Sequence, residues 1–340
     1  ASPSAATAPA PPPPRKPTRN ALLLTTLALA AAATTYQLSS SSSPPPSSLH
    51  YRTFTPFTIT SKTPISPTST IFTLSPPSPA STSTDTSQTD PYAPLWPTIW
   101  SLTFRQPQLQ VARSYTPLPP TTTLPTTTPG ALRFLIRREH GGEVSTYLSR
   151  LPVGSTIDVR GPVVEYNIPK DVSDVVFLAG GTGIAPALQV VRAVLGEGGE
   201  GGKDRKVKIL WANRQRSECA GAPLSVPWWR IWGTPGEAEQ PSPLVEELRG
   251  LEARYGGRVE GKYFIDAEGS FIDRRGILDA LRSYSEEGKE GRKMIMVAGP
   301  DGFVKHYVGA RVWEGGEEKQ GPLGGVVKSL GLGGWEVVKL

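Results

Sequence analysis

The hydrophobic pattern divides the chain beyond residue 48 into two regions with different periods. From 49 to 169, apolar residues come in short runs rich in Thr, Val, Ile and aromatic side chains, separated by Pro, Gly and Ser. Such runs are typical of β-strands joined by tight turns. The predicted strands lie within 51–60, 69–74, 97–104, 109–115, 131–139 and 155–161. No long helical period interrupts them, so we expect a small antiparallel β-barrel.

From 170 to 340, strand-like apolar runs alternate with helical patterns. The predicted strands are 175–179, 207–212, 258–265 and 293–299, and the predicted helices are 185–195, 243–255, 276–284 and 301–312. Strands that alternate with helices favour a parallel sheet covered on both faces. We therefore expect an α/β domain after the barrel, with surface insertions at 196–206 and 232–243.

The first 48 residues are almost wholly Ala, Pro, Ser and Thr around one apolar run. We divide them into a basic targeting segment (1–20), a transmembrane anchor (21–38) and a Pro/Ser linker (39–48). A spanning helix needs about 20 mostly apolar residues, so the apolar run is short for this purpose. A cleaved signal sequence and a mitochondrial targeting peptide are the alternatives. We favour a single anchor, with the basic residues on the matrix or cytosolic side.

Charge and cysteine content narrow the possible functions. The net charge of +6 is not gathered into Lys/Arg runs, whereas nucleic-acid binding needs clustered cations. We therefore expect no nucleic-acid partner. The single cysteine, Cys219, excludes an internal disulfide and a multi-cysteine metal site, and three scattered histidines make no metal centre.

A glycine-rich junction follows the first strand of the second region. Residues 174–195 read DVVFLAGGTGIAPALQVVRAVL, with Gly180, Gly181 and Gly183 before a helix that carries Pro186 in its first turn. Glycine allows a tight turn without side-chain bulk, and the free amides of a helix start favour a phosphate. Ligands of parallel sheets bind at this carboxyl edge. A tight turn with no ligand is the alternative, and the spacing is not G-x-G-x-x-G.

Three further motifs suit a nucleotide-like ligand. RSYT (113–116) ends a barrel strand, where a guanidinium can hold a pyrophosphate and an aromatic ring can face a ring system. GGEVSTYL (141–148) is a loop that leads into a helix start, and AGPD (298–301) is another strand-to-helix turn. Taken singly, each motif is better explained without a ligand: as an ordinary strand end, a capped helix and a ligand-free connection, respectively.

The order of these motifs is more specific than any one of them. R-x-Y-T, G-G-x-x-S, G-G-T-G-I-A-P and A-G-P-D, on a barrel followed by a parallel sheet, resemble the ferredoxin–NADP reductase superfamily. VGSTIDVRGP (153–162) is similar to the cytochrome b5 reductase branch. The resemblance covers Tyr51 to the C-terminus, and it implies FAD as cofactor and NADH or NADPH as electron donor.

The resemblance also implies roles for individual residues. Arg113 would bind the FAD pyrophosphate, Tyr115 would pack on the isoalloxazine, and Thr116 would hydrogen-bond near its reactive nitrogen. The GGEVS residues would hold the FAD phosphates, while the GGTGIAP and AGP turns would form the nicotinamide-nucleotide pocket. The implied cofactor-binding residues are Arg113, Ser114, Tyr115, Thr116, Gly142, Glu143, Val144, Ser145, Gly180, Gly181, Thr182, Gly183, Pro186, Asn213, Arg214, Ala298, Gly299 and Pro300, and the implied catalytic residues are Tyr115, Thr116 and Thr182.

The chain departs from the family's pattern in two places. Ala298 stands where the family usually has Cys, which removes a polarizable group near the nicotinamide. The chain also ends WEVVKL, without the usual aromatic residue near the flavin. For the donor, Arg214 and Arg216 favour the 2′-phosphate of NADPH, with two solvated arginines as the alternative.

The sequence as a whole predicts a membrane-anchored FAD-dependent NAD(P)H oxidoreductase that passes electrons to haem or a haem protein. Its layout is similar to fungal mitochondrial cytochrome c import factors, which implies haem reduction for cytochrome c maturation, with cytochrome c or apocytochrome c as partner. The implied location is the mitochondrial inner membrane, with the soluble domain facing the intermembrane space. The alternatives are an ordinary NADH-cytochrome b5 reductase, acting on cytochrome b5 at the outer membrane or endoplasmic reticulum, and a non-catalytic reductase-like scaffold subunit.

Overall fold

The computed structural model describes residues 49–77, 90–121, 130–196, 205–223, 240–282 and 291–340. The predictions for 1–48, including the anchor at 21–38, lie outside these residues. Among the helices of the described ranges, none has both the length and the apolar character needed to cross a bilayer. From Pro46 onward the chain forms one compact unit.

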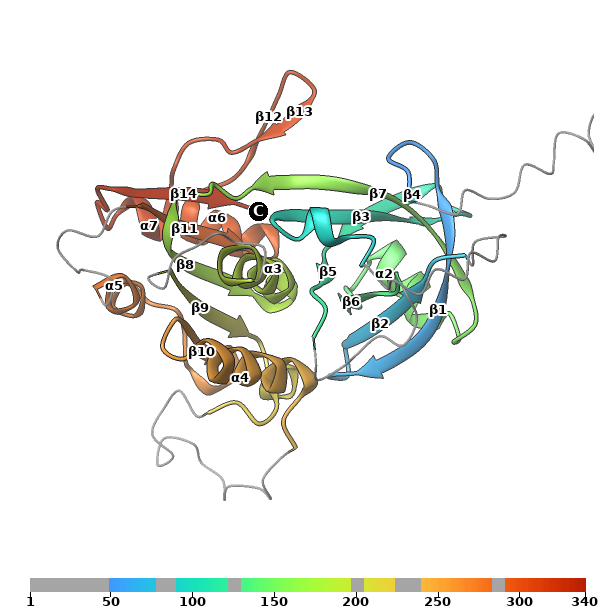
Figure 1. Cartoon of the computed structure of the whole chain (residues 1–340), viewed down its shortest axis with the longest axis horizontal. Coiled ribbons are helices and arrows are strands. Elements are labelled where there is room, and N and C mark those ends of the chain that lie inside the picture. The colour runs from blue at the N-terminus through green and yellow to red at the C-terminus, as the bar shows by residue number, and fades with distance from the viewer. Residues whose placement is uncertain (1–48, 78–89, 122–129, 197–204, 224–239, 283–290) are drawn as a thin grey trace, which may run out of the picture. The chain divides into compact units, whose positions relative to one another are not determined.

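The first region forms a seven-stranded antiparallel sheet in the order β4-β3-β7-β1-β2-β6-β5 (Figure 1). Its elements are β1 (Thr55–Pro64), β2 (Ser69–Ser75), the 3-10 helix η1 (Ala93–Leu95), β3 (Thr98–Gln106), β4 (Val111–Tyr115), β5 (Pro117–Leu118), β6 (Leu132–Arg137), α2 (Glu143–Arg150) and β7 (Thr156–Asn167). Only Thr116 separates the two edge strands, so the sheet curls back on itself around a core that contains Phe57, Trp100, Phe104 and Phe134. The predicted antiparallel β domain is confirmed.

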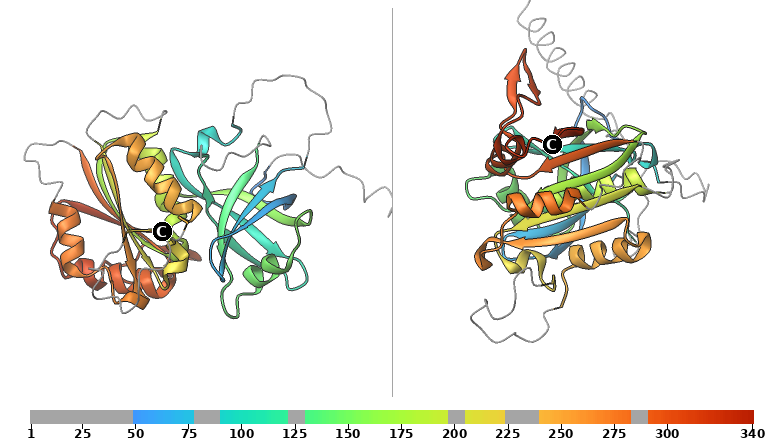
Figure 2. Two further views of the ribbon diagram at one scale, coloured as in Figure 1. Left: turned by 90° about the horizontal axis from the view of Figure 1, so that it is seen from below. Right: turned by 90° about the vertical axis from the view of Figure 1, so that its left-hand side faces the viewer.

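The second region forms a five-stranded parallel sheet in the order β10-β9-β8-β11-β14. Its elements are β8 (Val172–Gly180), η2 (Gly181–Gly183), α3 (Ile184–Leu195), β9 (Lys206–Asn213), η3 (Arg216–Cys219), α4 (Pro243–Tyr255), β10 (Val259–Ile265), η5 (Asp266–Glu268), α5 (Arg274–Arg282), β11 (Arg292–Ala298), α6 (Asp301–Val308), α7 (Gly325–Lys328) and β14 (Trp335–Lys339). Helices α3 and α4 cover one face, and α5, α6 and α7 cover the other (Figure 2). The central strand β8 is buried along its whole length, as expected for a strand covered on both faces. The predicted parallel-sheet domain is confirmed.

The C-terminal part differs from the sequence prediction. The helix predicted over 301–312 ends at Val308, because Gly309 follows with a φ of 85° that helical residues do not adopt. The chain then forms a hairpin of β12 (Val312–Glu314) and β13 (Glu317–Lys319). The final WEVVKL segment extends the parallel sheet as β14, beside β11.

Helix α3 packs the two domains together. The buried Gln189 side chain accepts the Trp100 N–H at 3.0 Å and donates to the carbonyls of Trp100 at 3.2 Å and Pro117 at 2.9 Å. The core under α3 also includes barrel side chains: Ile71, Ile99, Leu118 and Leu135. One shared core therefore sets the turn after β8 beside barrel strand β6.

Candidate active site

The first group of predicted residues lies where β4 meets the start of α2. Arg113 Nη2 is 3.9 Å from Glu143 Oε2, and both side chains are largely solvent-exposed. Gly142, the residue before the helix, has an extended backbone and offers no side-chain cap. At the other end of α2, Lys62 Nζ donates to two carbonyls, at 2.8 and 2.9 Å. No side chain caps the backbone N–H groups at the start of α2, and the Arg113 guanidinium lies beside them. Backbone N–H groups and a guanidinium are the donors that a diphosphate requires.

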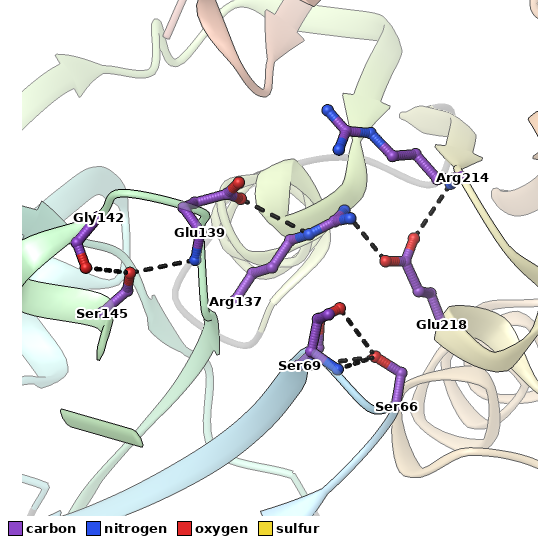
Figure 3. A network of polar contacts seen from close by, with 9 residues as sticks. Ser66, Ser69, Arg137, Glu139, Gly142, Ser145, Arg214 and Glu218 are labelled. Carbon is purple, nitrogen blue, oxygen red and sulfur yellow. Dashed lines mark hydrogen bonds and ion pairs between the residues drawn. The ribbon is translucent and has the colours of Figure 1, made fainter. Parts of the chain in front are cut away.

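The Ser145 hydroxyl supports the loop at this helix start. Its Oγ accepts the Glu139 N–H at 3.1 Å and donates to the Gly142 carbonyl at 3.2 Å (Figure 3). A Cβ on Gly142 would lie 2.6 Å from the same oxygen, so the loop needs glycine there. Because the Ser145 hydroxyl already donates to the Gly142 carbonyl, the backbone amides are the groups available to bind a phosphate.

Tyr115 closes strand β4 as a fixed aromatic surface. Its ring centroid is 5.0 Å from that of the buried Phe104. Burial raises the pKa of its phenol to about 12, while the Arg113 charge acts in the opposite direction. The phenol is therefore neutral at physiological pH. Beside it, Ser114 is exposed and Thr116 is half-buried.

Packing inside the protein explains two glycines of the G-G-T-G turn. A Cβ on Gly180 would lie 2.8 Å from the Phe303 ring, and a Cβ on Gly183 would overlap the carbonyl oxygen of Ala298. Gly299, with a φ of 154°, would place a Cβ 3.0 Å from Gly180 Cα. The predicted residues after β8 and β11 thus come together, as the shared carboxyl edge of a parallel sheet requires.

Gly181 is the glycine of this turn with an open side. Its φ is 54°, and its carbonyl accepts the Trp211 Nε1–H at 2.9 Å. Apart from its own chain neighbours, the only atom of the described residues within 4 Å of its Cβ position is Arg137 Nη1, at 3.8 Å. Helix α3 begins directly afterwards, and Gly183 gives it no side-chain cap. The Ile184 N–H is bonded within the turn, and Pro186 has no N–H. A positive charge therefore lies beside an open stretch of backbone at a helix start, which suits a phosphate.

Arg137, predicted only as part of a strand, links the two groups of residues. Its Nη1 is 3.0 Å from Glu218 Oε1 on η3, and its Nε is 3.6 Å from Glu139 Oε1 (Figure 3). The Arg137 and Glu218 side chains are 16% and 7% exposed. Glu218 Oε2 also accepts the Arg214 N–H at 3.1 Å. The pair therefore joins the barrel to the parallel-sheet domain at the turn that carries Gly181.

The crevice around this pair is narrow. A cavity of about 10 Å³ is lined by Arg137, Gly181, Thr182, Asn213 and Glu218, among others, and this volume holds about one water molecule. The buried Asn213 Nδ2 has no oxygen or nitrogen partner among the described residues. A dinucleotide can reach the hydrogen-bond donors of this site only if the residues that line the crevice move apart. A larger cavity of about 1160 Å³, between η1, α3 and α4, is lined by none of the predicted site residues.

The two arginines after β9 have different environments. Arg216 forms an ion pair with Glu268 and donates to the Ala222 carbonyl at 3.0 Å, so it ties η3 to η5. Arg214 is exposed, and its contacts among the described residues come from its backbone: its N–H donates to Glu218, and its carbonyl accepts the Ala267 N–H at 3.1 Å. Of the two, Arg214 is therefore the cation that a 2′-phosphate can reach.

The remaining predicted residues and the C-terminus make packing and hydrogen-bond contacts within the protein. Pro186 is buried in the first turn of α3, and Pro300 is the exposed N-cap of α6. The Leu340 N–H donates to the Val297 carbonyl at 2.9 Å. Trp335 packs on the face of the sheet that α5, α6 and α7 cover.

Two protein-family models match the chain. Residues 99–168 match an oxidoreductase FAD-binding domain, and residues 177–222 match an oxidoreductase NAD-binding domain. The first range contains the RSYT and GGEVS motifs, and the second contains the G-G-T-G turn and Arg214.

Several curated oxidoreductases are similar in sequence to this chain. The chain is 28% identical over 186 residues to NADH nitrate reductase 2 of Arabidopsis thaliana, which covers 51% of the chain and 17% of that protein. It is 26% identical over 234 residues to NADH-cytochrome b5 reductase 2 of Kluyveromyces lactis, with 67% of each covered. Against the Neurospora crassa protein of that name it is 26% identical over 236 residues, with 67% of the chain and 58% of the relative covered. The similarity to nitrate reductase thus spans about a sixth of that protein's length.

Solved structures show the same fold at low identity. The cytochrome b5 reductase domain of Ulva prolifera nitrate reductase superposes with a TM-score of 0.52 at 20% identity, covering 86% of this chain and 99% of that one. Ferredoxin-NADP+ reductase from Plasmodium falciparum also gives 0.52, at 12% identity, covering 86% and 100%. Two segments of the chain therefore match FAD-binding and NAD-binding domains of oxidoreductases, the structure shares the fold of ferredoxin-NADP+ reductase, and the sequence is similar to NADH-cytochrome b5 reductases.

Proposed function

We propose that this chain is a membrane-anchored FAD-dependent NAD(P)H oxidoreductase that passes electrons to haem or a haem protein. One observation carries the proposal: two sets of phosphate donors face the same junction from different domains. Arg113 and the start of α2 belong to the barrel, and the open turn at Gly181 belongs to the parallel sheet. Arg137 lies between them. Two diphosphate-bearing cofactors placed end to end need this arrangement.

On the barrel, the chain's own groups bind and orient the flavin. FAD, when bound, accepts two electrons from a nicotinamide and passes them on singly. Arg113 and the backbone amides of Glu143 and Val144 bind its diphosphate. Tyr115, neutral and fixed against Phe104, supplies a flat apolar surface for the ring system. The half-buried Thr116, between β4 and β5, would offer a hydroxyl to the ring.

On the parallel sheet, binding of the nicotinamide nucleotide requires the crevice to open. Its pyrophosphate binds at Gly181 and the start of α3, where Arg137 supplies a positive charge. The guanidinium then exchanges the Glu218 carboxylate for phosphate. Thr182, which lines the crevice, orients the nicotinamide toward the barrel. The curated sequence relatives named above have NADH in their names, and the exposed Arg214 adds a cation for the 2′-phosphate of NADPH.

We place the FAD-binding domain at 49–169 and the NAD(P)-binding domain at 170–340, with residues 21–38 as the anchor. The basic segment and apolar run before the Pro/Ser linker support an anchor. We place the protein in the mitochondrial inner membrane, with the head in the intermembrane space and haem reduction for cytochrome c maturation as its task. Carbonate extraction and protease protection of isolated mitochondria test the anchor and its orientation, and a protein recovered only from another membrane would contradict this placement.

An ordinary NADH-cytochrome b5 reductase is the second candidate, because several curated relatives bear that name. The purified full chain, loaded with FAD, should reduce ferricyanide with NADH or NADPH. Reduction of haem bound to apocytochrome c, without reduction of cytochrome b5, favours the first candidate, and the reverse favours the second. Bound FAD without reduction of any acceptor would indicate the non-catalytic scaffold, for which Ala298 and the narrow crevice are the arguments.

A further inference from the structure

The larger cavity, of about 1160 Å³, lies where the barrel meets helices α3 and α4. Its wall combines residues at η1 and after β5, the link between β7 and β8, and the two helices. Ligand cavities in proteins measure about 300 to 1,000 Å³ and often lie between domains. This cavity is therefore large enough for a small organic molecule and is placed where such molecules bind.

The cavity is separate from the candidate active site. Helix α3 begins at Ile184, beside the G-G-T-G turn, whereas the cavity is lined by Leu188, Arg192, Ala193 and Gly196 further along the same helix. Arg192 lies eight residues beyond Ile184, which is about 12 Å along a helix axis. A ligand in the cavity would therefore occupy a site of its own.

Positive charge dominates the described part of the wall. The basic residues that line the cavity are Lys170, Arg192, Arg205 and Arg254. Glu247 is the one acidic residue among the described residues that line it, and its carboxylate is already paired with Arg133, 3.4 Å away. The electrostatics of the cavity therefore favour an anion.

Arg192 is held in the wall by an aromatic ring. Its guanidinium carbon is 5.4 Å from the centroid of the Trp96 ring, and Trp96 is fixed in turn because its Nε1–H donates to Asp90 Oδ2 at 2.6 Å. The Arg192 side chain is half-buried, and the described residues include no hydrogen-bond acceptor or carboxylate partner for it. A guanidinium fixed in this way can form paired hydrogen bonds with the two oxygens of a carboxylate.

Arg205 brings the link between β7 and β8 to the end of α3. Its Nη1 donates to the Val194 carbonyl at 3.4 Å, and its Nη2 donates to the Lys170 carbonyl. A cation here also offsets the negative end of α3, so Arg205 has a structural role without any ligand. The exposed Lys170 ammonium, in contrast, has no carboxylate within 4 Å in the described ranges. Arg192 and Lys170 are thus the cations that an anion can pair with.

Much of the remaining wall is apolar. It includes several prolines of the barrel and of the link, together with Leu188 on α3 and Leu251 on α4. An inorganic anion would leave these surfaces unused, whereas a hydrocarbon body would bury them. The wall therefore favours a ligand with both a charged and an apolar part.

We propose that this cavity binds a small amphipathic anion, an apolar body that carries one carboxylate. Arg192 and Lys170 bind the carboxylate, and the apolar surfaces of α3, α4 and the prolines cover the body. The inference stands apart from the proposed function, because none of these residues is assigned to FAD or to the nicotinamide nucleotide.

Calorimetry on the purified full chain with octanoate, octanol and inorganic phosphate tests the proposal. We expect one octanoate per chain, bound about tenfold tighter than octanol, because octanol lacks the charge that pairs with Arg192. Arg192→Met keeps an apolar side chain against Trp96 and removes the guanidinium. It should raise the Kd of octanoate about tenfold and leave the Kd of octanol unchanged.

Two further variants place the site. Ala193→Phe puts a ring into the cavity and should abolish binding of both octanoate and octanol. The control Arg275→Met removes an 89%-exposed arginine side chain from α5, on the other face of the sheet, and should match the wild type. Circular dichroism shows whether each variant is folded, and if Ala193→Phe is not, the comparison of Arg192→Met with Arg275→Met still decides.

Several results would overturn the proposal. One is the lack of saturable octanoate binding by the wild type. Another is an unchanged octanoate Kd in Arg192→Met, or an equal loss of affinity in Arg275→Met. Phosphate that binds as tightly as octanoate would contradict the apolar part of the ligand. Binding of several octanoates per chain, unaffected by a folded Ala193→Phe variant, would show adsorption elsewhere on the protein.

Discussion

Two arginines on strand β6 reach from the barrel to the parallel-sheet domain in different environments. Arg133 and Arg137 lie on the same face of the strand, since side chains alternate. Arg133 Nη2 is 3.4 Å from Glu247 Oε2 and 2.7 Å from the Pro119 carbonyl, and both side chains of the pair are 4% exposed. The Arg137–Glu218 pair is more exposed and lines the crevice beside Gly181.

The difference separates a structural contact from an exchangeable one. The Arg133–Glu247 pair is almost fully buried, although Glu247 also borders the larger cavity between η1, α3 and α4. Burial raises the pKa of Glu247, and the Arg133 charge acts to lower it. Removing Arg133 or Glu247 leaves the other charge buried without an opposite charge to pair with. The Arg137–Glu218 pair borders the crevice proposed to bind the nicotinamide nucleotide, and the proposed function requires a phosphate to replace the carboxylate there.

The largest expected effect is the loss of stability in Arg133→Leu. It leaves the Glu247 carboxylate buried and unpaired, which should lower the free energy of unfolding by about 3 kcal/mol or more at pH 7. The folded-state pKa of Glu247 is raised and would rise further without Arg133, so its contribution to stability is present below about pH 4.3 and is lost as pH rises through the folded pKa. Urea unfolding between pH 5 and 8 measures this, and a deficit that does not grow with pH would contradict the account.

The matched substitution Arg137→Leu should act mainly on ligand binding. We expect the Kd of ADP-ribose to increase about tenfold, because a charged hydrogen bond to phosphate is lost. Arg133→Leu should leave this Kd unchanged. Calorimetry on the FAD-loaded protein measures both, and equal effects of the two variants on affinity would remove the distinction between the pairs.

Glu218→Gln should change affinity in the opposite direction. Removal of the carboxylate that competes for Arg137 should tighten ADP-ribose binding about threefold to fivefold, since binding no longer breaks an ion pair. A purely structural pair would instead give weaker or unchanged binding in both variants. The sign of the change in Kd therefore decides the question.

The smallest expected effect concerns Cys219, next to Glu218. Burial raises the pKa of its thiol to about 12, with a smaller contribution from the Glu218 charge. A thiol-specific disulfide reagent should therefore react slowly with the folded protein. The rate should increase about tenfold for each unit of increase in pH, because the thiolate fraction does so. Glu218→Gln should increase the rate about twofold, and Arg133→Leu should not. Rapid reaction of the folded wild type at pH 8 would contradict the buried placement of η3.

Both domains could be predicted from the sequence because their strands follow clear periods. The continuous apolar run of β8 and the helix of α4 match the structure closely, since burial on both faces and a serine cap with a following proline act locally. The early end of α6 at Gly309 depends on the close approach of Gly324, whose Cα would lie 3.0 Å from a Cβ there. This contact leaves no pattern in the helix sequence, whereas Gly309 itself, with its φ of 85°, is a local signal for a helix end.

The sequence motifs predicted which residues form the candidate site, but not the packing contacts that hold them there. Gly180 and Gly183 were expected to face a ligand, and the structure shows that contacts to Phe303 and Ala298 already require glycine there. Arg137 and Glu218 were missed because a strand period shows only that Arg133, Leu135 and Arg137 share a face. The partners of that face come from another domain, 81 residues further on for Glu218.

The most direct measurement is an anaerobic titration of the purified full chain with NADH and NADPH, followed by visible absorption. The account holds that a flavin is bound at Arg113 and Tyr115, within reach of a nicotinamide at Gly181 and Thr182. It predicts a yellow protein that bleaches with one equivalent of donor and recovers its colour when an oxidised haem protein is added. A colourless protein that takes up no FAD, or a yellow one that neither donor bleaches, would contradict it.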